Sequence, residues 1–168
     1  MSIGYEIDVT ALQVAQAYAA IANAGILVPP RIVLGTRDED GSILRAAPPE
    51  PRRVVSERTA LTMTNMMEGV VLRGTGKSAQ ISGYHVAGKT GPAKKVLAGG
   101  GGYTTSEYYA SFGGFGPLRE PRLVGFVVLD TPRGGIYYGG QVAAQLGDRV
   151  GEVGGSDPRR FQRRAADR

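Results

Sequence analysis

The sequence predicts an α+β domain, and two features of the chain support this. Apolar residues recur at helical spacing in two segments of the N-terminal half, and three extended apolar runs follow them. The connections between those three runs contain glycine and lack the dozen or more residues that a parallel crossover requires. We therefore expect an antiparallel sheet flanked by helices, in the order helix, hairpin, helix, three strands, helix.

The first helix is expected over residues 8–23. Its apolar face would consist of Val14, Tyr18 and Ile21. Thr10 stands three residues before Gln13, which is the spacing of a capping box. Gly25 follows the helix and is expected to close it, because glycine readily adopts the conformation of a helix C-terminus.

A hairpin and a second helix come next. Residues 31–44 place turn-forming residues between two short apolar runs, which predicts a hairpin, and the proline-rich residues 48–51 form a connector. Ser56 is expected to cap a helix that runs to about Leu72. The apolar face of this helix would consist of Met63, Met67, Val70 and Val71.

The remaining elements are three strands and a final helix. Tyr84 and Val86 lead into an extended run ending in Lys-Thr-Gly, and a glycine loop at residues 99–102 precedes the strand at 108–115. The run at 123–129 is apolar enough for a central strand buried on both faces. Residues 139–150 complete the pattern as an amphipathic helix.

Length and composition limit the classes of function. The 168 residues suit one domain, which we place at residues 1–150, followed by an arginine-rich tail at 151–168 that we expect to be disordered. The formal charge is +5, and five arginines lie in that tail; the alternative to disorder is that the tail binds an anionic surface or nucleic acid. Without cysteine and with His85 as the single histidine, the sequence predicts no metal site and no cofactor.

The segment 83–92 satisfies two unrelated functional patterns. From Gly83 it reads G-x-x-x-x-G-K-T, the phosphate loop of nucleotide hydrolases. From Lys89 it reads Lys-Thr-Gly after a strand-like run, a signature of serine acyl-transferases of the penicillin-binding type. The spacers between Gly83 and Lys89 are bulky, and Gly91-Pro92 leads to a glycine run instead of a helix, so we expect no nucleotide to bind.

The residues around Lys-Thr-Gly resemble the C-terminal part of the transpeptidase domain of class B penicillin-binding proteins, the septal and elongation enzymes of peptidoglycan synthesis. The matching segments are Ser2-Ile-Gly-Tyr5, Val9-Thr10, Gln13 to Tyr18, Gly74-Thr-Gly76, Val86 to Gly91, Tyr109 to Phe112 and Tyr138 to Ala144. They follow the order of the family and together cover most of residues 2–147.

This resemblance implies a partial serine β-lactamase/transpeptidase-like fold and acyl transfer from a D-Ala-D-Ala stem peptide or a β-lactam. In the family, the positions of Lys89, Thr90 and Gly91 form the strand that binds the substrate carboxylate. The residue after this glycine supplies an oxyanion-hole N–H, which Pro92 lacks.

The nucleophile of the family lies in Ser-x-x-Lys, with a second motif Ser-x-Asn, and neither occurs in these residues. The chain is therefore expected to be a truncated transpeptidase domain, inactive alone, with an open sheet edge at 123–129 that pairs with a complementary N-terminal fragment or a second copy. The alternative is a non-catalytic interaction module that uses this edge and the basic tail to bind a cell-wall protein.

The resemblance also suggests where the protein works. Members of the family act outside the cytoplasmic membrane behind an N-terminal anchor. The sequence itself shows neither an export signal nor a transmembrane segment, so this chain alone is expected in the cytoplasm.

Overall fold

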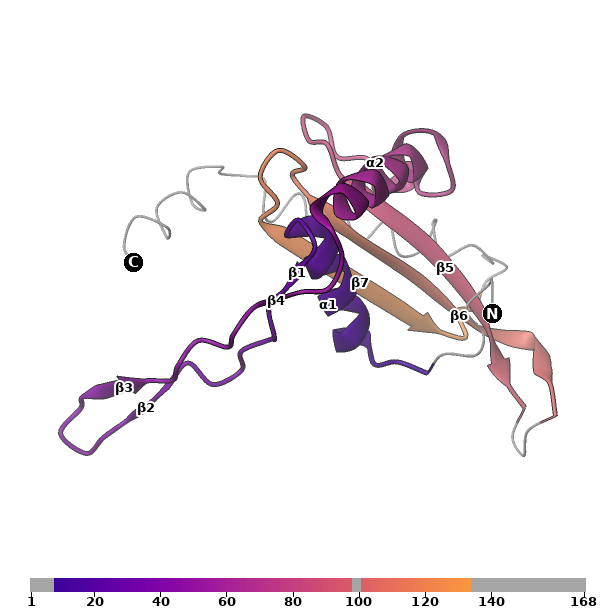
Figure 1. Ribbon diagram of the computed structural model, residues 1–168. Helices are drawn as coiled ribbons and strands as arrows, with labels where there is room; N and C mark the ends of the chain where they lie inside the picture. Colours follow the sequence, from indigo (N-terminus) through magenta and orange to yellow (C-terminus); the bar gives the residue numbers. More distant parts are fainter. Residues whose placement is uncertain (1–7, 98–100, 134–168) are drawn as a thin grey trace.

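The computed structural model describes residues 8–97 and 101–133 (Figure 1). In that part of the chain the elements are, in order, α1 (Ala11–Ala22), β1 (Ile26–Leu27), β2 (Gly35–Arg37), β3 (Ile43–Arg45), β4 (Arg52–Arg53), α2 (Glu57–Arg73), the 3-10 helix η1 (Lys77–Ala79), β5 (Ala87–Val96), β6 (Tyr103–Gly116) and β7 (Leu123–Asp130). The expected helix at 139–150 and the expected tail at 151–168 lie outside the described residues.

The main sheet is an antiparallel meander of β5, β6 and β7, with β6 in the middle. Thr90 of β5 lies opposite Phe112 of β6, which in turn lies opposite Val127 of β7. The predicted antiparallel arrangement of the three strands is confirmed. Helices α1 and α2 contact each other and the sheet, α1 over β6 and β7 and α2 along β5 (Figure 1).

The start and end of α1 follow the sequence signals. The Thr10 hydroxyl accepts from the Gln13 N–H at 3.2 Å while the Gln13 side chain accepts from the Thr10 N–H at 2.8 Å, so the capping box is confirmed. Gly25 follows with φ of 84°, and a β-carbon there would lie 2.3 Å from the Val55 carbonyl oxygen. The close approach to Val55 and the left-handed backbone both require glycine at this position.

The predicted apolar face of α2 is correct in part. Ser56 caps the helix by accepting from the Thr59 N–H at 3.1 Å, and Met67 and Val71 are buried. Met63, however, is 40% exposed. It lies one turn closer to the helix N-terminus than Met67.

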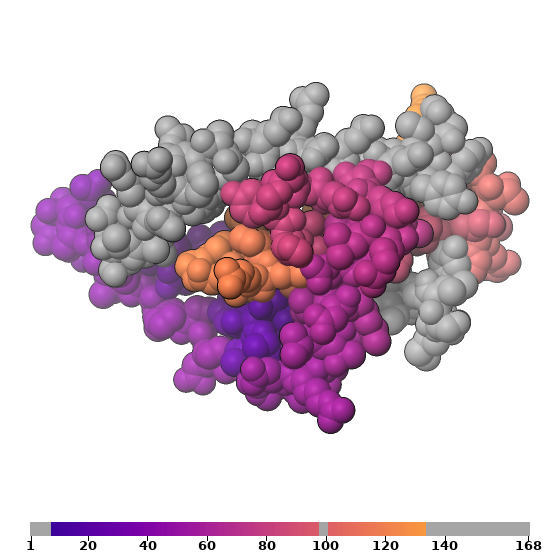
Figure 2. Space-filling view, turned by 90° about the horizontal axis from the view of Figure 1, so that it is seen from above, coloured from indigo at the N-terminus to yellow at the C-terminus, as the bar shows by residue number. Residues whose placement is uncertain are grey.

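The core consists of two small apolar clusters between the helices and the sheet. Phe112 packs with Val71 and Ala79, and Phe115 packs with Met67 and Ala87. Leu118, from the connection between β6 and β7, joins the second cluster. Figure 2 shows this connection, in orange, lying beside the magenta surface of α2, so that segments distant in sequence close the core.

Two expectations about the strands are wrong. Strand β5 begins at Ala87, whereas Tyr84 and Val86 precede it, because Gly83 adopts φ of 81° in a turn in which Tyr84 bridges back to Ile81. Strand β7 is not buried on both faces, and among the described strands it pairs with β6 alone. Its exposed apolar residues are Leu123, Val124 and Val128.

The predicted hairpin exists with shorter strands than expected. Residues 35–37 pair with 43–45, and this hairpin projects from the body of the protein (Figure 1). The pairing of β1 with β4 was not predicted, because each strand has only two residues. Arg53 reinforces this pairing by donating to the Ala24 carbonyl oxygen at 2.8 Å.

Candidate active-site strand

Strand β5 holds the four residues that the sequence singled out. Lys89, Thr90, Gly91 and Pro92 lie opposite Gly113, Phe112, Ser111 and Ala110 of β6. Within the described part of the chain β5 is an outer strand, so its other edge faces away from the sheet. The Lys89 side chain is exposed, and its Nζ donates to the Thr90 carbonyl oxygen at 2.6 Å.

The Thr90 hydroxyl meets a hydroxyl from a distant segment. Thr90 is 6% exposed, and its Oγ1 lies 2.8 Å from Oγ1 of Thr75. Thr75 comes from the loop that follows α2 and is itself exposed. The structure therefore brings an exposed and a buried hydroxyl together at β5, where the Lys89 ammonium contacts the backbone of the same threonine.

Thr75 was not among the site residues identified from the sequence. Its loop is held close to α2 by glycines, since a β-carbon on Gly74 would lie 2.9 Å from the Val70 α-carbon and one on Gly76 would lie 3.4 Å from a Val70 methyl. The Gly-Thr-Gly pattern is the signal that a close approach occurs here. The partner of the threonine is not visible in the sequence because it lies fifteen residues away.

Gly91 leaves room for a contact between strands. The Ser111 hydroxyl donates to the Gly91 carbonyl oxygen at 2.7 Å, and a β-carbon on residue 91 would lie 2.7 Å from that same Ser111 oxygen. A side chain at this position would displace Ser111 and its hydrogen bond. The close approach of Ser111 therefore explains why the third residue of Lys-Thr-Gly is glycine.

Pro92 is exposed on β5 and has no N–H to donate. Proline in a sheet is confined to outer strands and strand ends, where a ladder hydrogen bond is not required. The outer position of β5 among the described strands explains how proline is accommodated. At this position the strand offers a carbonyl oxygen but no backbone donor.

The phosphate-loop interpretation does not fit this geometry. Lys89 and Thr90 lie inside a ten-residue strand, and the strand continues to Val96 without a helix. A phosphate loop needs amides that point at the phosphate from a turn entering a helix N-terminus. The expectation that the segment binds no nucleotide agrees with this geometry.

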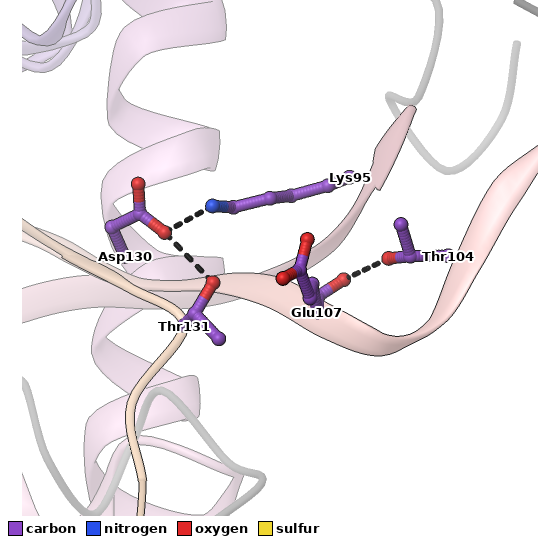
Figure 3. Close-up of polar contacts among 5 residues, drawn as sticks. All are labelled: Lys95, Thr104, Glu107, Asp130 and Thr131. Atoms are coloured by element: carbon purple, nitrogen blue, oxygen red, sulfur yellow. Dashed lines mark hydrogen bonds and ion pairs between the residues drawn. The ribbon is translucent and has the colours of Figure 1, made fainter. Parts of the chain in front are cut away.

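A charged contact joins β5 and β7 at the end of the sheet where both strands finish (Figure 3). The Lys95 ammonium of β5 pairs with the Asp130 carboxylate of β7 and lies 5.0 Å from the centre of the Tyr109 ring of β6. Thr131 also donates to Asp130 at 2.8 Å. The hydrogen bond from Lys95 is the main cause that lowers the pKa of Asp130, and the same bond raises the pKa of Lys95.

Lys95 lies at an irregularity in β5. The register between β5 and β6 shifts between Lys94 and Val96, as in a β-bulge. A bulge re-aims a side chain and ends regular pairing. Lys95 lies at this shift, so one residue links all three strands.

The single histidine, His85, lies between the turn at Gly83 and the start of β5. His85 Nδ1 lies 2.7 Å from Glu68 Oε1 of α2, with the histidine side chain largely exposed. Among residues 8–97 and 101–133 no group of three acidic, histidine or cysteine side chains is arranged to hold a metal ion. No helix in that part of the chain is long and apolar enough to cross a membrane.

Comparisons with known proteins place this strand in a family. Residues 1–152 match the model of the penicillin-binding protein transpeptidase domain. The chain is 38% identical over 140 residues to penicillin-binding protein PbpB of Mycolicibacterium smegmatis, covering 79% of this chain and 22% of that protein. It is 41% identical over 147 residues to peptidoglycan D,D-transpeptidase FtsI of Escherichia coli, covering 86% of this chain and 23% of that protein.

Solved structures agree with the sequence relatives. The apo crystal structure of penicillin-binding protein 3 from Mycobacterium tuberculosis superposes with a TM-score of 0.77 at 34% identity, over 88% of this chain and 36% of that chain. The transpeptidase domain of Burkholderia pseudomallei penicillin-binding protein 3 gives a TM-score of 0.74 at 38% identity, over 92% and 44%. The predicted α+β fold of the transpeptidase type is confirmed.

The chain spans less than a quarter of the length of these two curated relatives. The matched family model nevertheless covers 152 of its 168 residues, including the strand that carries Lys-Thr-Gly. The protein therefore belongs to the penicillin-binding protein transpeptidase domain family.

Proposed function

We propose that Lys89, Thr90 and Gly91 form the carboxylate-binding strand of a peptidoglycan D,D-transpeptidase cleft. Its ligands would be stem peptides that end in D-Ala-D-Ala and the β-lactams that resemble them. The observation that carries this proposal is the hydrogen-bonded pair of hydroxyls of Thr75 and Thr90 on the strand that also bears the exposed Lys89 ammonium. A cation next to hydroxyl donors is a favourable environment for a carboxylate.

The pair of threonine hydroxyls fits this role because it can still donate one hydrogen bond to a ligand. Each threonine hydroxyl carries one proton, so one member of the pair donates to the other and a single O–H is left over. Since Thr75 is exposed and Thr90 is buried, an anion approaching β5 reaches the pair from the Thr75 side. Lys89 would turn from the Thr90 carbonyl oxygen, which it contacts at 2.6 Å, towards the bound anion.

The acyl-accepting serine has to come from outside these 168 residues. No serine in the sequence is followed three positions later by lysine, and no asparagine is preceded two positions earlier by serine. Activation of a serine hydroxyl in this type of site depends on that lysine. The chain would therefore contribute the binding half of the cleft, and alone it would form no acyl-enzyme.

A fluorescent penicillin tests the first part of the proposal. The isolated chain, incubated with the reagent and analysed by gel fluorescence and intact mass, is expected to gain no covalent adduct. An adduct on one of its own serines would show that the chain carries a nucleophile and would overturn the proposal.

A chimera tests the binding role of β5. The serine-bearing part of the M. tuberculosis penicillin-binding protein 3 domain is fused to this chain, and the rate of penicillin labelling is measured. We expect Lys89→Ala to reduce the rate at least tenfold, whereas Lys94→Ala, which changes another exposed lysine of the same strand, leaves it unchanged. Equal rates in the two variants would show that Lys89 does not bind the carboxylate of the ligand.

A non-catalytic interaction module is the second candidate, and the outer strand β7 favours it. Leu123, Val124 and Val128 are 44%, 37% and 40% exposed on a strand that pairs with one neighbour among the described strands. Exposed strand edges bind additional strands. If a cell-wall protein pairs here, Val124→Lys should abolish its co-purification, and equal recovery with wild type and variant would argue against this candidate.

A further inference from the structure

The loop that follows α2 is tied to the helix at both ends. We call residues 74–80 the Thr75 loop; it contains η1 and precedes β5. At its start the Gly76 N–H donates at 3.1 Å to a carbonyl oxygen in the last turn of α2. At its end the Gln80 side chain donates from Nε2 to the carbonyl oxygens of Val71 at 2.9 Å and Leu72 at 3.4 Å. The loop therefore folds back over the end of the helix.

The contacts of Gln80 have a physical cause at the end of α2. The last four carbonyl oxygens of a helix have no partner within the helix, so they accept from donors that lie close by. A glutamine amide carries two protons, one for each of two carbonyl oxygens. Ala79, next to Gln80, packs in the same apolar cluster as Val71 and Phe112. Hydrogen bonds and packing thus hold the loop that carries Thr75.

Burial decides which hydroxyl donates in the hydrogen bond between Thr75 and Thr90. Thr90 is 6% exposed, and Thr75 is the partner that the described part of the chain provides for its hydroxyl. With Thr75 as donor, the proton of the buried Thr90 hydroxyl would lack an acceptor, which is costly. Thr90 therefore donates to Thr75, and the proton of the exposed Thr75 hydroxyl can point outward.

We propose that Thr75 donates the hydrogen bond that binds the ligand carboxylate in this cleft, with Thr90 and Gln80 as its positioning residues. The inference rests on the function proposed for β5, and it assigns the contact to a residue fifteen positions before the threonine of Lys-Thr-Gly. By donating to Thr75, Thr90 polarises the outward O–H of Thr75 and makes it a better donor. Gln80 holds the Thr75 loop in the place that this hydrogen bond requires.

A matched pair of ligands tests the contact. Acetyl-D-Ala-D-Ala ends in a carboxylate, whereas its C-terminal carboxamide has nearly the same shape without the charge. Each ligand is titrated into the isotope-labelled 168-residue chain, and the amide chemical shifts give the dissociation constant and show that each variant is folded. We expect wild type to bind the acid roughly tenfold more tightly than the carboxamide, because hydrogen bonds to a charged acceptor are stronger.

Substitutions in the hydroxyl pair locate the contact. Thr75→Val should reduce the preference for the acid roughly fivefold. Thr75→Ser, which keeps the hydroxyl, and Thr36→Val, which changes an exposed threonine of β2, should leave the preference unchanged. Thr90→Val should have a smaller effect than Thr75→Val, because the exposed hydroxyl remains. A preference that is lost in Thr90→Val and kept in Thr75→Val would assign the contact to Thr90 and overturn the proposal.

The positioning role of Gln80 is tested by combining substitutions. Gln80→Met keeps the length of the side chain and removes both amide protons, so it should lower the preference for the acid. In a chain that already carries Thr75→Val, the same substitution should have no further effect, because Gln80 acts through Thr75. An equal effect of Gln80→Met in both backgrounds would show that Gln80 does not position Thr75.

Lys89→Ala separates this inference from the function on which it rests. A preference for the acid that falls in Lys89→Ala but not in Thr75→Val would support the function proposed for β5 and overturn the role of Thr75. A wild-type chain that binds neither ligand, or binds both equally, would contradict the proposed function and with it this inference.

Discussion

Thr75 and Thr90 share a hydrogen bond of 2.8 Å that ties the loop after α2 to the strand carrying Lys-Thr-Gly. The two residues differ in exposure, since Thr90 is 6% exposed whereas Thr75 faces solvent. This asymmetry decides what each hydroxyl contributes. Water can replace the partner of Thr75, but it has little access to the hydroxyl of Thr90.

The asymmetry predicts unequal costs for two similar substitutions. Thr75→Val leaves the buried Thr90 hydroxyl without a partner, and an unsatisfied buried hydroxyl costs about 1–3 kcal/mol. Thr90→Val leaves only an exposed hydroxyl, so the free energy of unfolding should fall less. Urea denaturation measures both, with Thr75→Ser as the control that keeps the hydrogen bond. Equal losses for the two valine variants would show that the Thr90 hydroxyl is not dependent on Thr75.

The glycine before Lys89 is predicted to be required by packing against Phe112. A β-carbon on Gly88 would lie 2.5 Å from the Phe112 ring and 2.9 Å from the Gly113 carbonyl oxygen. Gly88→Ala should therefore lower the free energy of unfolding by about 1–3 kcal/mol, the usual cost of overpacking. Gly125→Ala on β7 is the matched control, because no heavy atom lies within 4 Å of its added β-carbon. Chemical denaturation that shows equal stability for both variants would contradict this packing.

The contact between Lys95 and Asp130 predicts a pH dependence at the far end of the sheet. The pKa of Asp130 is lowered by its bond from Lys95, so its stabilising contribution is present above the ordinary aspartate pKa of about 3.9 and is lost as the pH falls through the lowered value. The pKa of Lys95 is raised by the same bond. Its contribution is therefore complete below the ordinary lysine pKa of about 10.4 and is lost as the pH rises through the raised value.

Asp130→Asn should abolish the part of the stability loss at acidic pH that comes from protonation of Asp130. At neutral pH the free energy of unfolding should be only slightly lower, because the carboxylate is exposed. Urea midpoints measured from pH 2 to 7, about the range of the carboxyl titration, provide the test. Glu107 also contributes to the raised pKa of Lys95 and accepts from Thr104 only through its backbone carbonyl oxygen (Figure 3), so the control is Glu39→Gln, an exposed position between β2 and β3. A difference between wild type and Asp130→Asn that does not change with pH would exclude an ionic role for the pair.

The features that the sequence predicts correctly are those with local causes. The capping box of Thr10 and Gln13 and the cap at Ser56 involve neighbours three residues apart, and both are present. The position of Lys89 and Thr90 in an outer strand agrees with the strand pattern around them. What could not be predicted depends on distant partners. An apolar run such as that of β7 does not reveal which of its faces another element covers, and the proximity of Thr75 to Thr90 depends on how α2 ends against β5.

Pro92 gives the final prediction, which depends on the proposed transpeptidase role. The position after Lys-Thr-Gly would supply a backbone N–H to the developing oxyanion, and proline cannot supply it. In the chimera with a serine-bearing domain, Pro92→Thr is expected to raise the rate of penicillin acylation by roughly 100- to 1000-fold, the usual contribution of one oxyanion-hole donor. Pro121→Thr, an exposed proline in the connection between β6 and β7, is the control and should leave the rate unchanged. An unchanged rate in Pro92→Thr, with labelling still dependent on Lys89, would mean that another donor already stabilises the oxyanion while the carboxylate site of β5 remains valid.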